Sequence, residues 1–495
     1  RDQAIIWGTN QIFNGLVQPD TLARIRPCIA HRWEISASGL IYTFYLRNDV
    51  FFHDDPSFPR SKGRKVVAAD FVYSLGRLTD PLVASPGAWV MNAIDPDTTT
   101  TAIQAVDDTT LRIRLREPFP PLLSLLSMQY CSVVPHEAVE YYGASFRNHP
   151  VGTGPFRFKF WQEGVKLVLE KNPHYFETLD GTGLPYLDAV AISFIPDKQT
   201  VFLNFLQGKF DFMSGIDAAY KDELLTAGGA LQSKYKNRIT LITQQYLNTE
   251  YLGFVVDSSK NEQRALLYRN IRQAINLAFD RKKMIRYLRN NRGTPGIQGI
   301  IPKGLPAYDS LRIYYDHDPH KASALLAEAG YPGGRGLPPV TLVSTPDYLD
   351  ICRYIQHQVA ELGINLNIEV STPAAMKEMK AEAKLGFFRA SWIADYPDAE
   401  NYLSMFLSRN FCPQGPNYTH YSNDRFDRLY QQAMLTVDDD TRISLYREME
   451  GIMMADAPVV VLYYDQVLRF TGKNITGLGS NPMNLLTLKY VRKLP

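Results

Sequence analysis

The segment Val340–Val370 places the strongest constraint on how this chain folds. It contains a predicted strand at Val340–Ser344, a helix at Pro346–Leu362 and a second strand at Ile364–Val370. A strand–helix–strand unit of this kind joins two parallel strands through a right-handed crossover. The apolar run Phe387–Trp392 predicts a further strand of the same sheet. We therefore expect α/β architecture in the second half of the chain.

The first half of the chain is predicted to be rich in β-structure. Leu40–Phe52 alternates apolar and polar residues, as one strand does. Ala102–Pro118 and Gly152–Phe176 each show two alternating runs around a polar turn, the pattern of a hairpin. Ala189–Met213 changes from a strand to a short helix and back to a strand. These patterns indicate a β-rich first half that precedes the α/β region.

Helical periodicity is clearest in the second half. Asn270–Leu288 places its apolar residues on one stripe, with a capping-box-like start at Asn270 and Gln273. His317–Gly334 predicts another helix that ends near Gly330. A last apolar run, Ala457–Phe470, is long enough to return as a strand to the first half of the fold.

Composition excludes several classes of protein. With 495 residues, the chain is long enough for about three domains. The formal net charge is +2, from 53 basic and 51 acidic residues, and no basic block is present, so nucleic acid is not an expected partner. The longest apolar runs fall far short of the roughly 20 residues of a membrane-spanning helix. We expect a water-soluble protein.

The sequence contains no common catalytic motif. GxSxG, Walker A, GxGxxG and HExxH are all absent. The local groups His53–Asp55 and Asp316–Asp318 combine histidine with carboxylates, but such residues in turns are usually caps or solvated side chains. We predict no enzyme activity, no metal site and no cofactor.

The four cysteines, Cys28, Cys131, Cys352 and Cys412, are far apart and form no CxxC pair. This spacing excludes a zinc ribbon and leaves their disulfide state open.

The segment SWIADYPDAENYLSMF, Ser391–Phe406, is the strongest candidate site. A strand ends there in an indole and a group of carboxylates. Asp395, just past the strand end, suits a ligand ammonium, and Arg389 suits a ligand carboxylate. Trp392 can form the wall of a side-chain pocket. The residues alone leave two other interpretations open, a loop or helix-capping role for Asp395 and an internal salt bridge for Arg389.

Seven collinear segments resemble one known family. The resemblance is to family 5 of the extracellular solute-binding proteins, the dipeptide- and oligopeptide-binding proteins of ABC importers. The segments that carry it are LRNDVFFHDDPSFPRSKGRKVVAADFVYSLGRLTDP, PVGTGPF with NPHYF, IRQAINLAFDRKKMI, HDPHKASALLAEAGYP, SWIADYPDAENYL, NYTHYSNDRFDRLYQQA and DAPVVVLYY.

The resemblance implies an α/β protein with the two-lobed periplasmic-binding-protein fold (class II-like, cluster C), a central hinge and an extra inserted subdomain. The first lobe is expected to be discontinuous, with residues 1–40, 152–261 and 465–495. The inserted subdomain is expected at 41–151 and the second lobe at 262–464.

The resemblance also implies a function. The chain is expected to be the substrate-binding component of an ABC importer that captures di- to oligopeptides and delivers them to permease subunits. Asp395 would bind the peptide ammonium and Arg389 a carboxylate, while main-chain groups of Ser391 and Ile393 would pair with the peptide backbone. The predicted ligand-binding residues are Arg389, Ser391, Trp392, Ile393, Asp395 and Tyr396.

Some features stay open within this resemblance. Family members also carry oligosaccharides, nickel chelates or haem, so a non-peptide ligand is the alternative. A second pocket tryptophan of the family falls near Pro373, where this chain has none, so ligand length does not transfer. The family implies a monomer in the periplasm or on the outer face of the cell membrane, with any targeting segment or lipid anchor upstream of residue 1.

Overall fold

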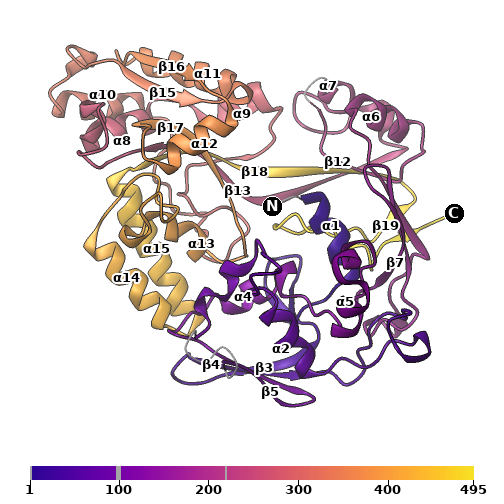
Figure 1. Cartoon of the computed structure of the whole chain (residues 1–495). Coiled ribbons are helices and arrows are strands. Elements are labelled where there is room, and N and C mark those ends of the chain that lie inside the picture. The colour runs from indigo at the N-terminus through magenta and orange to yellow at the C-terminus, as the bar shows by residue number, and fades with distance from the viewer. Residues whose placement is uncertain (1–2, 96–101, 218–219) are drawn as a thin grey trace. The chain divides into compact units, whose positions relative to one another are not determined.

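The computed structural model describes residues 3–95, 102–217 and 220–495 and divides into two compact units (Figure 1). Unit 1 comprises Arg1–Ala218, Tyr235–Ile242 and Leu468–Pro495, and unit 2 comprises Ala219–Lys234 and Thr243–Val467. Two of the points at which the chain passes from one unit to the other lie within long strands, β13 (Ile239–Phe254) and β18 (Val459–Gly472).

The division differs from the expected lobe boundaries in three segments, 219–234, 243–261 and 465–467. All three were expected in the first lobe and belong to unit 2. The reason is long-range pairing. The end of β13 pairs with a strand of unit 2, and Lys221 Nζ donates to Asn290 Oδ1 at 2.8 Å within that unit. The inserted subdomain at 41–151 stays a prediction.

Among the described residues of unit 1, two antiparallel sheets have more than two strands. The four-stranded sheet has the order β3-β4-β6-β5 and the three-stranded sheet the order β11-β8-β7. Both expected hairpins are present, as β5–β6 and β7–β8. The strands of these sheets are β3 (Ala30–Ile35), β4 (Ile41–Leu46), β5 (Ile103–Asp107), β6 (Thr110–Arg114), β7 (Phe156–Gln162), β8 (Lys166–Lys171) and β11 (Ala189–Ser193).

Shorter elements complete unit 1. The helix expected between β11 and β12 is α6, and Asp197 is its N-cap, whose carboxylate accepts a hydrogen bond from Thr200 N. These elements are α1 (Gln3–Ile12), β1 (Val17–Pro19), β2 (Ile25–Pro27), α2 (Ala68–Gly76), α4 (Leu122–Leu126), α5 (His136–Tyr142), β9 (Thr178–Leu179), β10 (Thr182–Gly183), α6 (Lys198–Leu206), β12 (Phe212–Ser214), β19 (Ile475–Thr476) and β20 (Arg492–Lys493).

The PVGTGPF segment is held by a buried histidine. His53 Nε2 donates to Gly154 O at 2.9 Å, and Gly152 N donates to His53 Nδ1 at 3.4 Å. A Cβ on Gly152 would lie 2.1 Å from Ile12 O, so only glycine allows this close approach. Burial lowers the pKa of His53 to about 4, so the ring is neutral. His53 therefore has a structural role in unit 1.

Unit 2 is built on a mixed sheet. Its strands follow the order β18-β13-β17-β15-β16, with β14 paired to β18. β15 and β16 are parallel and joined by α11, as the strand–helix–strand unit predicted, and β17 is the further strand. Strands not yet bounded are β14 (Thr294–Pro295), β15 (Val340–Ser344), β16 (Leu366–Val370) and β17 (Phe387–Ile393).

Helices surround this sheet in unit 2. α11 packs on β16, α10 on α8, and α14 on α15 (Figure 1). The helices are α7 (Lys221–Leu224), α8 (Arg269–Leu277), α9 (Arg281–Arg289), α10 (Pro319–Glu328), α11 (Leu349–Ala360), α12 (Pro373–Ala381), α13 (Glu400–Leu403), α14 (Asp424–Leu435) and α15 (Asp439–Asp456). Among the described residues, none of the helices has the length and apolarity needed to cross a bilayer.

The single helix expected at Asn270–Leu288 is wrong, because the segment forms two helices. Asp280 leaves the helical conformation, with φ −85° and ψ 99°, and its carboxylate accepts from Lys283 N as the cap of α9. The expected capping box is also absent. Tyr268 precedes α8 without a side-chain cap, and Asn270 instead donates to Glu328. The apolar stripe could not reveal a break that a capping residue produces within it.

Two buried arginines explain the charged residues within this apolar segment. Arg272 donates to the main-chain oxygens of Asp456 and Ala457, and Arg281 donates to Val461 O. Each guanidinium thus satisfies carbonyl groups at or within β18, which lies in the core of unit 2. This bonding fixes α8 and α9 against the sheet.

Candidate functional site

β17 is covered unequally along its two edges. It lies between β13 and β15 in the sheet. Its antiparallel pairing with β13 covers the whole strand, from Phe387 to Ile393. Its parallel pairing with β15 contains one pair, Val343 opposite Phe388. The strand is therefore paired only near its start on the β15 side.

The backbone groups of Ser391 and Ile393 face this less covered edge. Ala394 N donates to Leu247 O at 2.9 Å, on the β13 side. Because backbone direction alternates along an antiparallel strand, Trp392 also faces β13, whereas Ser391 and Ile393 face away from it. No strand within the described ranges pairs with these two residues on that side. Ile393 is 48% exposed.

One buried amide fixes the turn that follows the strand. Asn401 Oδ1 accepts from Trp392 Nε1 at 2.9 Å and from Asp395 N at 3.1 Å. Asn401 lies on α13 and is almost completely buried. The indole of Trp392 and the backbone of Asp395 are therefore held by the same acceptor, while Asp395 itself is half-buried. The sequence analysis did not identify Asn401.

Arg389 forms an ion pair inside unit 2. Its Nη2 donates to Glu250 Oε2 on β13, and the Glu250 side chain is 3% exposed. The guanidinium carbon lies 3.3 Å from the centre of the Tyr348 ring, a cation–π contact. Tyr348 Oη donates to Glu250 Oε1 at 3.1 Å, which closes the triangle. The internal salt bridge left open for Arg389 is thus present.

A wider polar network surrounds this pair. Asn248 Nδ2 donates to Glu250 Oε1 at 3.1 Å and lies 3.4 Å from Asp465 Oδ2. Asp465 in turn accepts from Arg289 Nη2 at 2.8 Å. Burial and the nearby Asp465 carboxylate raise the pKa of Glu250, and Arg389 opposes that shift. Sequence reasoning missed this network because its members come from separate parts of the chain.

Tyr396 and the carboxylates after it lie inside unit 2. The Tyr396 hydroxyl donates to Glu400, and the Tyr430 hydroxyl donates to the other oxygen of the same carboxylate. Burial raises the pKa of Glu400 to about 7, although both hydroxyls act against the shift. Asp398 Oδ1 accepts from Glu400 N at 2.9 Å. Asp398 and Glu400 therefore stabilise the turn, and of the predicted site residues Tyr396 is the most enclosed.

The two local histidine–carboxylate groups have structural partners. Asp54 pairs with Lys62, and Asp55 accepts from the Tyr142 hydroxyl. Asp316 pairs with Lys282, and Asp318 caps α10. Within the described ranges, no three His, Cys, Asp or Glu side chains are grouped to hold a metal ion. All four cysteines are buried thiols without a disulfide.

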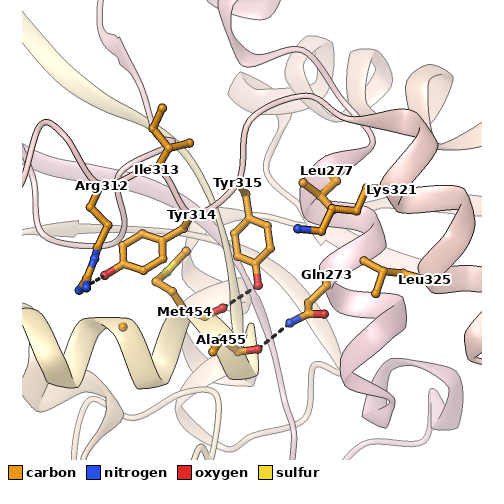
Figure 2. A pocket seen from close by; sticks show the side chains of 11 residues that line it. Gln273, Leu277, Arg312, Ile313, Tyr314, Tyr315, Lys321, Leu325, Met454 and Ala455 are labelled. Carbon is orange, nitrogen blue, oxygen red and sulfur yellow. Dashed lines mark hydrogen bonds between the residues drawn. The ribbon is translucent and has the colours of Figure 1, made fainter.

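A separate hollow of about 410 Å³ opens on unit 2 (Figure 2). Several polar groups of its lining are already engaged, among them Arg312, whose Nη1 donates to Tyr314 Oη at 3.4 Å. Tyr315 Oη donates to Met454 O and Gln273 Nε2 to Ala455 O, both at 2.7 Å. The hollow does not include any predicted site residue. It is lined by Gln273, Leu277, Arg312, Ile313, Tyr314, Tyr315, Lys321, Leu325, Gly451, Met454 and Ala455.

An α/β fold in which a strand with a partly unpaired edge ends in a charged turn is consistent with a solute-binding protein. The family profile described as bacterial extracellular solute-binding proteins, family 5 Middle, matches residues 24–411. The chain belongs to this family, whose members are the substrate-binding components of ABC transporters.

Two curated relatives cover nearly the whole chain. Heme-binding protein A of Haemophilus influenzae is 28% identical over 468 residues, which cover 91% of this chain and 81% of that protein. Glutathione-binding protein GsiB of Escherichia coli O1:K1 is 27% identical over 479 residues, which cover 95% of this chain and 86% of the relative.

Solved structures support the same fold. HbpA2 from Haemophilus parasuis superimposes with a TM-score of 0.85 at 24% identity, covering 100% of this chain and 96% of that chain. DppA from Helicobacter pylori, in complex with the peptide STSA, gives a TM-score of 0.75 at 26% identity, with coverages of 100% and 94%. The expected family and the two-lobed α/β fold class are confirmed.

Proposed function

We propose that this chain captures short peptides with a free amino terminus at the end of β17. The single observation that carries the proposal is the unpaired edge formed by Ser391 and Ile393, directly before Asp395. An extended peptide pairs with such an edge through main-chain hydrogen bonds, which give affinity with little dependence on sequence. DppA, a relative in fold, is in complex with the peptide STSA.

Each end of the peptide has a proposed partner in this region. Asp395 binds the ammonium group, because its carboxylate lies two residues past the strand end in a turn that Asn401 fixes. Trp392 provides a side-chain wall whose orientation is set by its bond to Asn401. Tyr396 stabilises the turn through the hydrogen bond that its hydroxyl donates to Glu400.

Arg389 is the proposed partner of a ligand carboxylate, in competition with Glu250. Its Nε is buried and has no hydrogen-bond partner among the described residues, so the guanidinium keeps a donor beyond the Glu250 pair. Lys380 adds positive charge close by. Burial and then the nearby Arg389 lower the pKa of Lys380 to about 8. A carboxylate placed between the two cations would be favourable.

Glutathione and haem are the second candidates, favoured by the names of the two curated relatives. Glutathione is a tripeptide with one free ammonium and two carboxylates, so it would use the same residues. Haem carries carboxylates and no ammonium, and it would bind without Asp395.

Calorimetry with the Asp395→Asn variant tests the proposal. A neutral amide removes the ammonium partner, and we expect binding of free-amine peptides to weaken by at least tenfold, while acetylated peptides bind weakly to both forms. Asp424→Asn, an exposed aspartate of α14, is the matched control. Unchanged affinity of Asp395→Asn for free-amine peptides would contradict the role of Asp395 as the ammonium partner. Binding of haem but of no peptide would show that the ligand is haem.

We further propose that the chain acts as a monomer outside the cytoplasmic membrane, as a binding protein without catalytic activity, and passes its ligand to permease subunits. A lipid anchor upstream of residue 1 belongs to the same proposal. The extracellular character of the family supports this location.

A further inference from the structure

A cysteine, a histidine and an aspartate form a hydrogen-bonded relay in unit 2. Cys412 Sγ lies 3.3 Å from His420 Nε2. His420 Nδ1 lies 3.3 Å from Asp257 Oδ2. The order of groups is nucleophile, base and orienting carboxylate, with the base in contact with both others.

The carboxylate selects the tautomer of the imidazole. Although partial burial acts against it, hydrogen bonds from Ser259 and from His420 hold the pKa of Asp257 below its usual value, so the group is ionised. An ionised carboxylate accepts hydrogen bonds only, so His420 Nδ1 carries the proton that points to it. The lone pair of Nε2 is then directed at the thiol of Cys412.

The ring of His420 is fixed in place by packing and by an unusual backbone conformation. It stacks on Phe411 with ring centres 4.7 Å apart and planes at 5°. The φ angle of His420 is +51°, in the left-handed region. Such conformations are uncommon for residues other than glycine and are enriched at functional sites. His420 is 8% exposed, so the ring has little freedom to turn away from Cys412.

We propose that Cys412 is a thiol that reacts with hydrogen peroxide, with His420 as its base and Asp257 as the residue that orients the base. The thiol sulfur attacks one oxygen of the peroxide while its proton passes to His420 Nε2. The O–O bond breaks, and the leaving hydroxide takes the proton back from Nε2 to form water. The sulfur is oxidised by two electrons to a sulfenic acid, and the peroxide is reduced.

The surroundings of Cys412 restrict the oxidant to a small molecule. Cys412 is 4% exposed, but it is followed by two exposed residues, Pro413 and Gln414. Hydrogen peroxide is small enough to reach such a sulfur, whereas a peptide or a large disulfide is not. Lys380 O, at 3.4 Å, is a second acceptor for the thiol proton, but a carbonyl cannot take the proton during attack.

The three other cysteines provide internal controls. Burial raises the pKa of all four thiols, that of Cys28 and of Cys131 to about 12, so the thiol pKa does not set Cys412 apart; Cys131 Sγ contacts a main-chain oxygen. Cys352 Sγ lies 3.3 Å from Ser344 Oγ, a hydroxyl that is no base. All three are buried thiols without a histidine in the contacts that these residues make. Burial alone therefore predicts equal, slow oxidation of all four.

The test is the rate of sulfenic acid formation at each cysteine in the whole folded chain. The protein is treated with hydrogen peroxide, trapped with dimedone and quantified by peptide mass spectrometry. We expect Cys412 to react at least tenfold faster than Cys352, since a positioned base accelerates such steps by about two orders of magnitude or more. His420→Asn, which tolerates the left-handed backbone, should remove this advantage. Asp257→Asn should reduce the rate advantage of Cys412 over Cys352 and change how the Cys412 rate depends on pH.

Equal rates at Cys412 and Cys352 in the wild-type protein would overturn the proposal without need of any variant. An unchanged Cys412 rate in folded His420→Asn would overturn the role of the base. Should that variant unfold, all four cysteines become equally reactive, and Asp257→Asn together with the wild-type comparison decides.

Discussion

Arg389 on β17 donates to Glu250 on β13, and the two side chains lie diagonally across the antiparallel pair, on the same face of the sheet. The pair is enclosed, with side-chain exposures of 14% and 3%. A buried pair of this kind gains little over apolar residues, but the loss of one partner leaves an uncompensated charge. Arg389 therefore contributes to the stability of unit 2 and lies on the same strand as the proposed peptide-binding edge.

Arg389→Met is expected to destabilise the protein by about 3 kcal/mol, because Glu250 then remains buried without its countercharge. Urea unfolding followed by fluorescence measures the change. Arg389→Met combined with Glu250→Leu should recover part of the loss, since both charges are removed. A loss below about 0.5 kcal/mol in the single variant would show that the pair is solvated, and would favour a role for Arg389 in ligand binding alone.

Ile393→Pro tests the open strand edge directly. Proline removes the backbone N–H that faces away from β13, and it leaves the pairing of Trp392 with β13 intact. Losing one main-chain hydrogen bond should weaken peptide binding by about tenfold, with a small change in Tm. Ile393→Val, which keeps the donor, is the control. Unchanged peptide affinity in the proline variant would contradict strand addition at this edge.

Local sequence patterns predicted much of the fold. The strand–helix–strand unit, both hairpins and β17 follow from short-range alternation and turn residues, which act within a few residues. The break at Asp280 was missed because an aspartate inside an apolar stripe can be either a surface residue or a cap. The two compact units differ from the expected lobes around β13 because the end of that strand pairs with a distant strand, β17.

The sequence predicted where the candidate site lies in the chain but not which contacts hold it. Trp392 and Asp395 stand out in the sequence because a strand ends there in an indole and carboxylates. Glu250 and Asn401 do not, because their roles arise from pairing between β13 and β17 and from the turn into α13. The Cys412 relay was not predicted either, because its base, His420, and its carboxylate, Asp257, come from separate loops that are far apart in the sequence.

His53 is expected to make unit 1 less stable at acidic pH. Burial lowers its folded-state pKa from 6.5 to about 4, so below pH 6.5 the unfolded chain binds a proton that the folded one resists. Stability should therefore fall as the pH drops from about 6.5 to about 4, by at most about 1.4 kcal/mol per pH unit. His53→Gln should flatten this part of the curve. His357→Gln, at an exposed site, should leave it unchanged.

Glu450 should make the stability of unit 2 depend on pH in the opposite direction. Its carboxyl is 1% exposed, and Ile301 N donates to Oε1 at 2.9 Å. Gly299, with φ +112°, passes so close that a Cβ there would lie 2.2 Å from the same oxygen. Burial raises the pKa of Glu450 from 4.5 to about 8. The folded state thus holds a proton that the unfolded chain releases above pH 4.5.

Stability is therefore expected to fall as the pH rises from about 4.5 to about 8, because the folded state binds more protons than the unfolded one throughout that window. Glu450→Gln keeps the shape of the side chain and cannot ionise. Its free energy of unfolding relative to the wild type should rise by about 2 kcal/mol or more between pH 5 and pH 8, measured by urea unfolding at each pH. Glu448→Gln on the same helix, which removes a half-exposed carboxylate paired with Arg425, is the control. A pH-independent difference between Glu450→Gln and the wild type would mean that Glu450 ionises normally, and the close approach of Gly299 would then have to open to admit water.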